Sequence, residues 1–152
     1  MADGIQYVGT RYDELYDLLD WWGYEVVPDP DFSRWQETLY TSPLTGLVKV
    51  TGRRDDLTVK FEEFWVKGDR GEEAALVREG ASLVRYHYHC QASNGGIRWC
   101  FYPEDHPDDP IHVHPFPEAG DPVICDPIDP KMALKTFEDC VYMTDCGPSE
   151  QE

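Results

Sequence analysis

Four of the five histidines in this 152-residue chain form two His-x-His pairs, and all five lie between positions 87 and 114. The pairs are His87 with His89 and His112 with His114. In an extended segment residues i and i+2 point to the same side, so each pair can present two imidazoles together. Imidazole binds metals and phosphates and carries protons near neutral pH. The clustering therefore predicts a functional site in this part of the chain.

The first histidine pair falls in a predicted β-hairpin, in which Ala81–Ala92 and Gly96–Tyr102 flank an Asn-Gly turn. Centring the turn on Asn94-Gly95 pairs Cys90 with Trp99 and His89 with Cys100. One predicted face is apolar: Val84, Tyr86, Tyr88, Cys90, Ile97, Trp99 and Phe101. The other is mostly polar: Arg85, His87, His89, Gln91, Arg98, Cys100 and Tyr102. A one-residue slip would destroy this segregation, which supports the predicted faces.

Three interpretations of the polar face remain open. The side chains of His87, His89 and Cys100 suit Zn²⁺, with the segment that carries His112 and His114 folded over them. The histidines can also act as general acids and bases without a metal. The third interpretation is an ordinary solvated sheet face, on which polar residues are expected.

His112-x-His114-x-x-x-Glu118 also resembles the metal motif of the cupin barrels. Prolines at 115 and 117 interrupt the strand that this motif needs, and the preceding glycine is missing. The cupin interpretation is therefore the lesser alternative. The chain has no phosphate-binding glycine loop, nucleophile elbow or His-Glu-x-x-His motif.

A helix and several strands are predicted to position these residues. The apolar spacing over 11–22 predicts a helix with Thr10 as its N-cap and Gly23 at its end. Residues 28–34 read as a loop. A short strand is expected at 47–51, then a polar turn at 52–56 and a longer strand at 57–66. The longer strand places these apolar residues on one face: Leu57, Val59, Phe61 and Trp65.

Residues 68–73 read as a turn, and the proline-rich segment 103–130 as a loop with at most short edge strands. A second helix is expected over 131–143, with Asp129 as N-cap and Pro130 at the first helical position. We therefore predict one α+β domain over 1–152, with antiparallel strands within 47–102. The sheet is expected to have four to five strands, a helix at each end of the chain and a histidine-bearing loop.

The chain has 30 acidic and 13 basic residues, and its net charge is −17. Repulsion on this scale destabilises a compact fold in dilute buffer, but at molar salt the Debye length falls to about 3 Å. With 41% hydrophobic and 13% aromatic residues, the composition predicts a folded protein of a halophile such as a haloarchaeon. An acidic DNA mimic and a simply acidic protein are the alternatives. Because salt screens the charge, a nucleic-acid substrate is not excluded.

No stretch approaches the about 20 apolar residues of a membrane span, and the start has no basic region followed by an apolar one. We therefore expect a soluble cytoplasmic protein without a membrane partner. The odd number of cysteines, none of them in a Cys-x-x-Cys motif, does not favour a disulfide framework, and most of them are expected to be buried.

From Leu57 to about Cys140 the chain resembles the TumE family, the small toxin components of prokaryotic toxin–antitoxin pairs. The resemblance is carried by short motifs: Phe61-Glu62-Glu63-Phe64-Trp65, Arg85-Tyr86-His87-Tyr88-His89-Cys90-Gln91, Asn94-Gly95, Pro110-Ile111-His112-Val113-His114 and the helix Met132–Val141. It implies a toxin-like protein with a small antitoxin as partner. The family's Asp-Asn pair before its histidine-rich loop is missing after Arg98–Tyr102, which implies a divergent or inactive relative.

In this interpretation the protein acts on RNA or another nucleic acid through its histidines. His112 and His114 are the first candidates for acid–base catalysis, followed by His87 and His89. The supporting residues are Arg85, Arg98 and Tyr102 for the substrate, and Glu62 or Glu63 to orient an imidazole. The alternatives are a non-catalytic module that binds Zn²⁺ or a similar ion through its histidines and Cys100, and an adaptor or structural protein.

Overall fold

Alternating burial along the strands defines the two faces of a large antiparallel sheet. The computed structural model describes residues 4–27, 45–71, 74–78, 80–101, 111–116 and 122–142. Within these ranges the elements are α1 Gly4–Trp21, β1 Glu25–Val27, β2 Thr45–Arg54, β3 Leu57–Lys67, β4 Leu76–Arg78, β5 Ala81–Ala92, β6 Gly95–Phe101, β7 Ile111–His114, β8 Val123–Ile124 and α3 Pro130–Tyr142.

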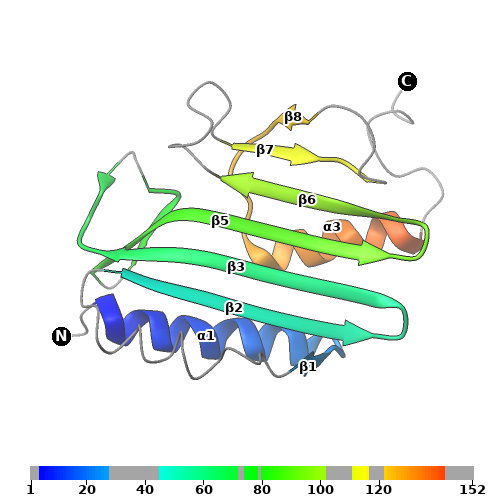
Figure 1. Ribbon diagram of the computed structural model, residues 1–152, viewed down its shortest axis with the longest axis horizontal. Helices are drawn as coiled ribbons and strands as arrows, with labels where there is room; N and C mark the ends of the chain where they lie inside the picture. Colours follow the sequence, from blue (N-terminus) through cyan, green and yellow to red (C-terminus); the bar gives the residue numbers. More distant parts are fainter. Residues whose placement is uncertain are drawn as a thin grey trace.

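The strands follow the order β1-β2-β3-β5-β6-β7-β8, and β4 pairs with β5 beyond the end of β6. The α+β class is confirmed. The expected four to five strands are too few, because the described residues form an eight-stranded sheet. The prediction missed the short strands β1 and β4, whose few residues carry too little alternation to be recognised. Figure 1 shows the long strands side by side, with α1 along β2 and α3 behind β5.

Both helices pack on the same face of the sheet and close one hydrophobic core. Leu15 and Leu19 of α1 and Leu134 and Phe137 of α3 are almost fully buried in one cluster with the apolar side chains of the sheet. In β3 the predicted apolar face is confirmed: Leu57, Val59, Phe61 and Trp65 are all at most 2% exposed. The opposite face of the long strands carries no helix in the described part of the chain.

The helix ends follow standard capping chemistry, with one correction. Thr10 lies inside α1 and is not its N-cap, because the helix begins at Gly4. The predicted end is confirmed: Gly23 has φ 86°, and the Tyr24 N–H donates to the Leu19 carbonyl at 2.9 Å. The Asp129 N-cap is also confirmed, because its Oδ1 accepts a hydrogen bond of 2.8 Å from the Met132 N–H.

Glu63 lies on the core face of β3 and is completely buried. Its carboxylate forms a bidentate ion pair with Arg11 of α1, in which Nε donates to Oε1 at 2.8 Å and Nη2 donates to Oε2 at 2.9 Å. Trp65 Nε1 and the Tyr88 hydroxyl also donate to it, at 2.9 and 2.5 Å. Burial opposes charge on Arg11, but hydrogen bonding and attraction to Glu63 raise its pKa above the ordinary value. The network joins α1 to β3 and β5.

The hairpin β5–β6 has the predicted faces but a different register. Ala92 pairs with Gly95, Cys90 with Ile97 and His87 with Cys100, so the two-residue turn is Ser93-Asn94. The predicted register is wrong by two residues. Gly95, with φ 146°, begins β6 in a conformation that side-chain-bearing residues rarely adopt. A shift of two preserves the side-chain faces, so apolar patterning cannot distinguish the two registers.

Val84 was expected on the apolar face, and this prediction is wrong. The β3–β5 ladder shifts between Phe64 and Trp65, which pair with Arg85 and Leu83. Val84 is the unpaired residue of this bulge and is partly exposed, whereas Leu83 is 3% exposed in the core. A bulge reverses the alternation beyond it, so Leu83 takes the inward position.

The predicted loop 28–34, the first part of the proline-rich segment (103–110) and the predicted substrate-binding residue Tyr102 lie outside the described residues. The strands β7 and β8 arise from the proline-rich segment, and both are short, as predicted. The expected edge position is wrong for β7, because it pairs with β6 on one side and β8 on the other. Cys90, Cys100 and Cys125 are not part of a disulfide, whereas Cys140 of α3 is disulfide-bonded. In the described residues no helix has the length and apolar character needed to cross a membrane.

Candidate metal centre on the open sheet face

Both histidine pairs lie on the sheet face opposite the helices, and the strand ladders align them in two rows. The first row crosses β3, β5, β6 and β7 through Glu62, His87, Cys100 and His112. The second crosses the same strands through Lys60, His89, Arg98 and His114. Directly opposite residues have Cβ atoms about 4.5–5.5 Å apart, so each row is a chain of neighbouring side chains. We call these the Cys100 row and the Arg98 row.

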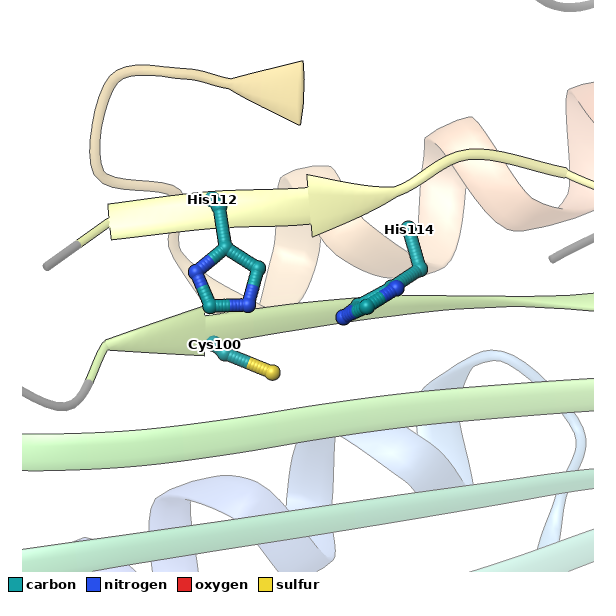
Figure 2. Close-up of side chains that lie close together, drawn as sticks. All are labelled: Cys100, His112 and His114. Carbon is teal, nitrogen blue, oxygen red and sulfur yellow. The ribbon is translucent and has the colours of Figure 1, made fainter. Parts of the chain in front are cut away.

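Cys100, His112 and His114 converge in a potential metal-binding cluster. The thiol sulfur and one ring nitrogen from each histidine all lie within 4.8 Å of one another. Cys100 is 5% exposed and His112 7%, whereas His114 is half-buried. Figure 2 shows the three side chains in front of the sheet, from β6 and β7, with both helices behind.

The local sequence explains how β7 supplies two ligands on one side. Its Val113 opposes Trp99 and packs against the core, so the flanking His112 and His114 must point to the other face. The two imidazole centroids are 5.1 Å apart, with the rings nearly perpendicular. Cys100 lies between Trp99 and Phe101, which are both buried in the core, and so faces the same way as the histidines.

His87 and His89 border this cluster on the β5 side. His87 is directly opposite Cys100, and His89 is opposite Arg98. Their ring centroids are 6.1 Å apart with an interplanar angle of 29°. Sequence reasoning placed all five potential metal-ligating residues at one site; in the structure Cys100, His112 and His114 form the compact group, and the β5 histidines are its neighbours.

The remaining predicted site residues have different surroundings. Glu62 is opposite His87 on the open face, so the two residues are cross-strand neighbours. Glu63 is not brought to the histidines, because it lies in the buried network with Arg11. Arg85 lies on the open face, where its guanidinium carbon is 4.7 Å from the centre of the Phe64 ring.

Lys60 belongs to the Arg98 row and was missed by sequence reasoning. It is exposed and lies opposite His89. The sequence did contain a signal for its position. Lys60 lies between Val59 and Phe61, which are both buried, so the alternation of the strand places Lys60 on the open face.

The three-residue cluster has the donor set of a zinc site. Zn–N distances of about 2.0 Å and Zn–S distances of about 2.3 Å imply ligand atoms roughly 3.3 to 3.6 Å apart around a tetrahedral ion. The ligand atoms now lie within 4.8 Å of one another. Side-chain rotations that move these atoms by about 1 Å would bring them to the separations that a tetrahedral ion requires. Three protein ligands leave a fourth position for water or substrate, as in catalytic zinc sites.

The chain was compared with protein-family models, curated proteins and solved structures, and none of these comparisons found a match. The resemblance to the TumE family stays a prediction.

Proposed function

We propose that this protein binds Zn²⁺, or a similar transition metal, through Cys100, His112 and His114, and that this centre is its functional site. The observation that carries the proposal is the convergence of a thiol and two imidazoles to within 4.8 Å on one sheet face. Thiolate and imidazole ligands together select zinc over the hard cations Mg²⁺ and Ca²⁺, which prefer oxygen.

The surroundings support a metal site on two physical grounds. Two of the three residues are buried, so the ion would be partly shielded from water and its bonds correspondingly stronger. The ligands also come from paired strands, which are rigid compared with loops and hold donor atoms with little conformational freedom to lose on binding.

Metal titration of the untagged protein tests this proposal. We expect one equivalent of Zn²⁺ to bind the wild type, and Co²⁺ to give the sulfur-to-metal absorption of a thiolate ligand. The His114→Ala variant should lose most of this affinity. His89→Ala is the matched control, because it removes the same side chain from the same face but outside the cluster. Absence of binding to the wild type, or equal losses in both variants, would refute the proposal.

A toxin-like role in a prokaryotic toxin–antitoxin pair is the second candidate. What favours it is the placement of both histidine pairs together with Arg98 on one open face. General acid and base groups with a neighbouring cation are the parts needed to cleave a phosphodiester in RNA. In this role a small antitoxin is the partner, and His112 and His114 carry out the proton transfers or hold the metal.

Controlled expression in a host cell tests the toxin candidate. Growth should stop when the wild-type protein is expressed alone. It should recover when the gene next to that of this protein, which in this role encodes the antitoxin, is expressed with it. His112→Ala/His114→Ala should remove the toxicity, whereas Lys135→Ala, at an exposed position of α3, should not. Normal growth on induction of well-folded wild type would exclude this role.

A further inference from the structure

The open sheet face, over the residues that the structure describes, has a charge opposite to that of the whole chain. The chain carries −17, yet the side chains of β2, β3, β5 and β6 that lie in register with the histidines include these cations: Lys49, Lys60, Arg85 and Arg98. Over the same part of these strands, Glu62 is the acidic side chain that faces this way. A cationic strip in an acidic protein indicates a site for an anion.

Arg98 is the cation that lies closest in register to the metal-binding cluster. It is directly opposite His114 across the β6–β7 ladder and two residues before Cys100 in β6, so it neighbours two of the three proposed ligands. His89 lies on its other side in β5, and Lys60 follows in β3. The Arg98 row therefore begins at one proposed metal ligand, His114, and continues from it across β6, β5 and β3.

We infer that the substrate of this centre contains a phosphate group, which binds the metal's fourth position through one oxygen and the Arg98 guanidinium through others. The inference rests on the proposed metal site. A planar guanidinium can donate two parallel hydrogen bonds to phosphate, and such charge-assisted pairs are about twice as strong as neutral ones. His89 and Lys60 extend the same row for a second phosphate or a longer phosphate chain.

A phosphate ester accounts for both parts of the site better than other anions do. Its oxygens are hard donors that enter the open position of a zinc centre without displacing the thiolate or imidazoles. It also carries enough oxygens to contact metal and arginine together. Phosphate monoesters and the diesters of a nucleic-acid strand both offer these oxygens and can bind in this way.

Titration of Co²⁺-loaded protein with inorganic phosphate tests the inference. We expect the visible Co²⁺ spectrum to change with saturation, and the phosphorus resonance to broaden because the phosphate lies next to the paramagnetic ion. The Arg98→Gln variant should bind Co²⁺ with wild-type affinity but phosphate about tenfold or more weakly. A control is Arg53→Gln, which removes the same charge from an exposed position of β2, outside both rows, and should bind phosphate like the wild type.

The outcomes separate the two proposals. If the wild type does not bind Co²⁺ or Zn²⁺, the metal proposal fails and this inference falls with it. If metal binds but phosphate changes neither spectrum nor linewidth, the metal site stands and the phosphate inference is wrong. Equal weakening in Arg98→Gln and Arg53→Gln would show a general charge effect and would also overturn it. A dinucleotide and a sugar phosphate, titrated in parallel, distinguish a diester from a monoester.

Discussion

Glu62 and Glu63 are adjacent in β3, yet one lies on the open histidine face and the other is buried under α1. Glu62 is opposite His87, while Glu63 receives hydrogen bonds from Arg11, Trp65 and Tyr88. Two consecutive glutamates therefore have different surroundings, because successive side chains of a strand point to opposite faces of the sheet.

Replacement of Glu63 by Gln should destabilise the fold strongly. The change removes the fully buried counter-charge of the Arg11 guanidinium and leaves only its more exposed ion pair with Glu14. Breaking a buried pair in this way costs about 3–5 kcal/mol. Glu62→Gln is the matched control and should change the free energy of unfolding by less than about 0.5 kcal/mol. Urea denaturation measures both. Similar free energies for the two variants would contradict the structural role assigned to Glu63.

Zinc should stabilise the folded protein if the proposed centre is correct. At a free concentration of 100 times Kd, a ligand that binds only the native state adds about 2.7 kcal/mol. The midpoint of thermal unfolding should therefore rise with zinc concentration for the wild type. Cys100→Ala should remove this dependence while the metal-free protein still folds. A zinc-dependent rise that survives the substitution would exclude Cys100 as a ligand.

Stability should fall at alkaline pH because several tyrosines are buried. Burial raises the pKa of Tyr86 to about 12, and burial together with Glu63 raises the pKa of Tyr88 well above its ordinary value. In the unfolded chain these hydroxyls ionise near pH 10, at about their reference value. The unfolded state then binds fewer protons, so stability is complete below about pH 10 and declines as pH rises towards 12.

Tyr86→Phe isolates one part of this effect. The variant loses the hydrogen bond of 3.2 Å from the Ile128 N–H, so it should be about 1 kcal/mol less stable at neutral pH. Between pH 10 and 12 its unfolding free energy should fall less steeply than that of the wild type. The same change at exposed Tyr16 should leave the slope unchanged. A Tyr86→Phe curve parallel to the wild type would show that the buried hydroxyl is not linked to the alkaline loss.

Salt should increase stability steeply if the net charge of −17 reflects a halophilic origin. Raising KCl from about 0.1 M to about 1 M shortens the Debye length from about 10 to about 3 Å and screens repulsion among the carboxylates. Thermal unfolding across this series should show a midpoint that still rises near molar salt. A plateau at a few tenths molar would indicate an ordinary acidic protein.

Local patterns in the sequence were sufficient to predict the two helices, the long strands and most of the residues on each strand face. The two-residue alternation of Leu57, Val59, Phe61 and Trp65 predicted which face of β3 meets the core, because burying the polar face instead would be costly. The helix end at Gly23 and the Asp129 N-cap were predictable for the same kind of reason. Each depends on hydrogen bonds or dihedral angles within a few residues.

The tertiary structure decided the features that depend on distant partners. Apolar patterning cannot distinguish registers that differ by two residues, so only the folded ladder places His87 opposite Cys100. Alternation alone assigns Glu63 to the core face, but its burial is tolerable only because Arg11 of α1 meets it there. The pairing of Cys100 with His112 requires β7 to return beside β6, a long-range contact that no local pattern encodes. Sequence alone thus indicated which residues share a face, and the packing of separate elements determined which of them touch.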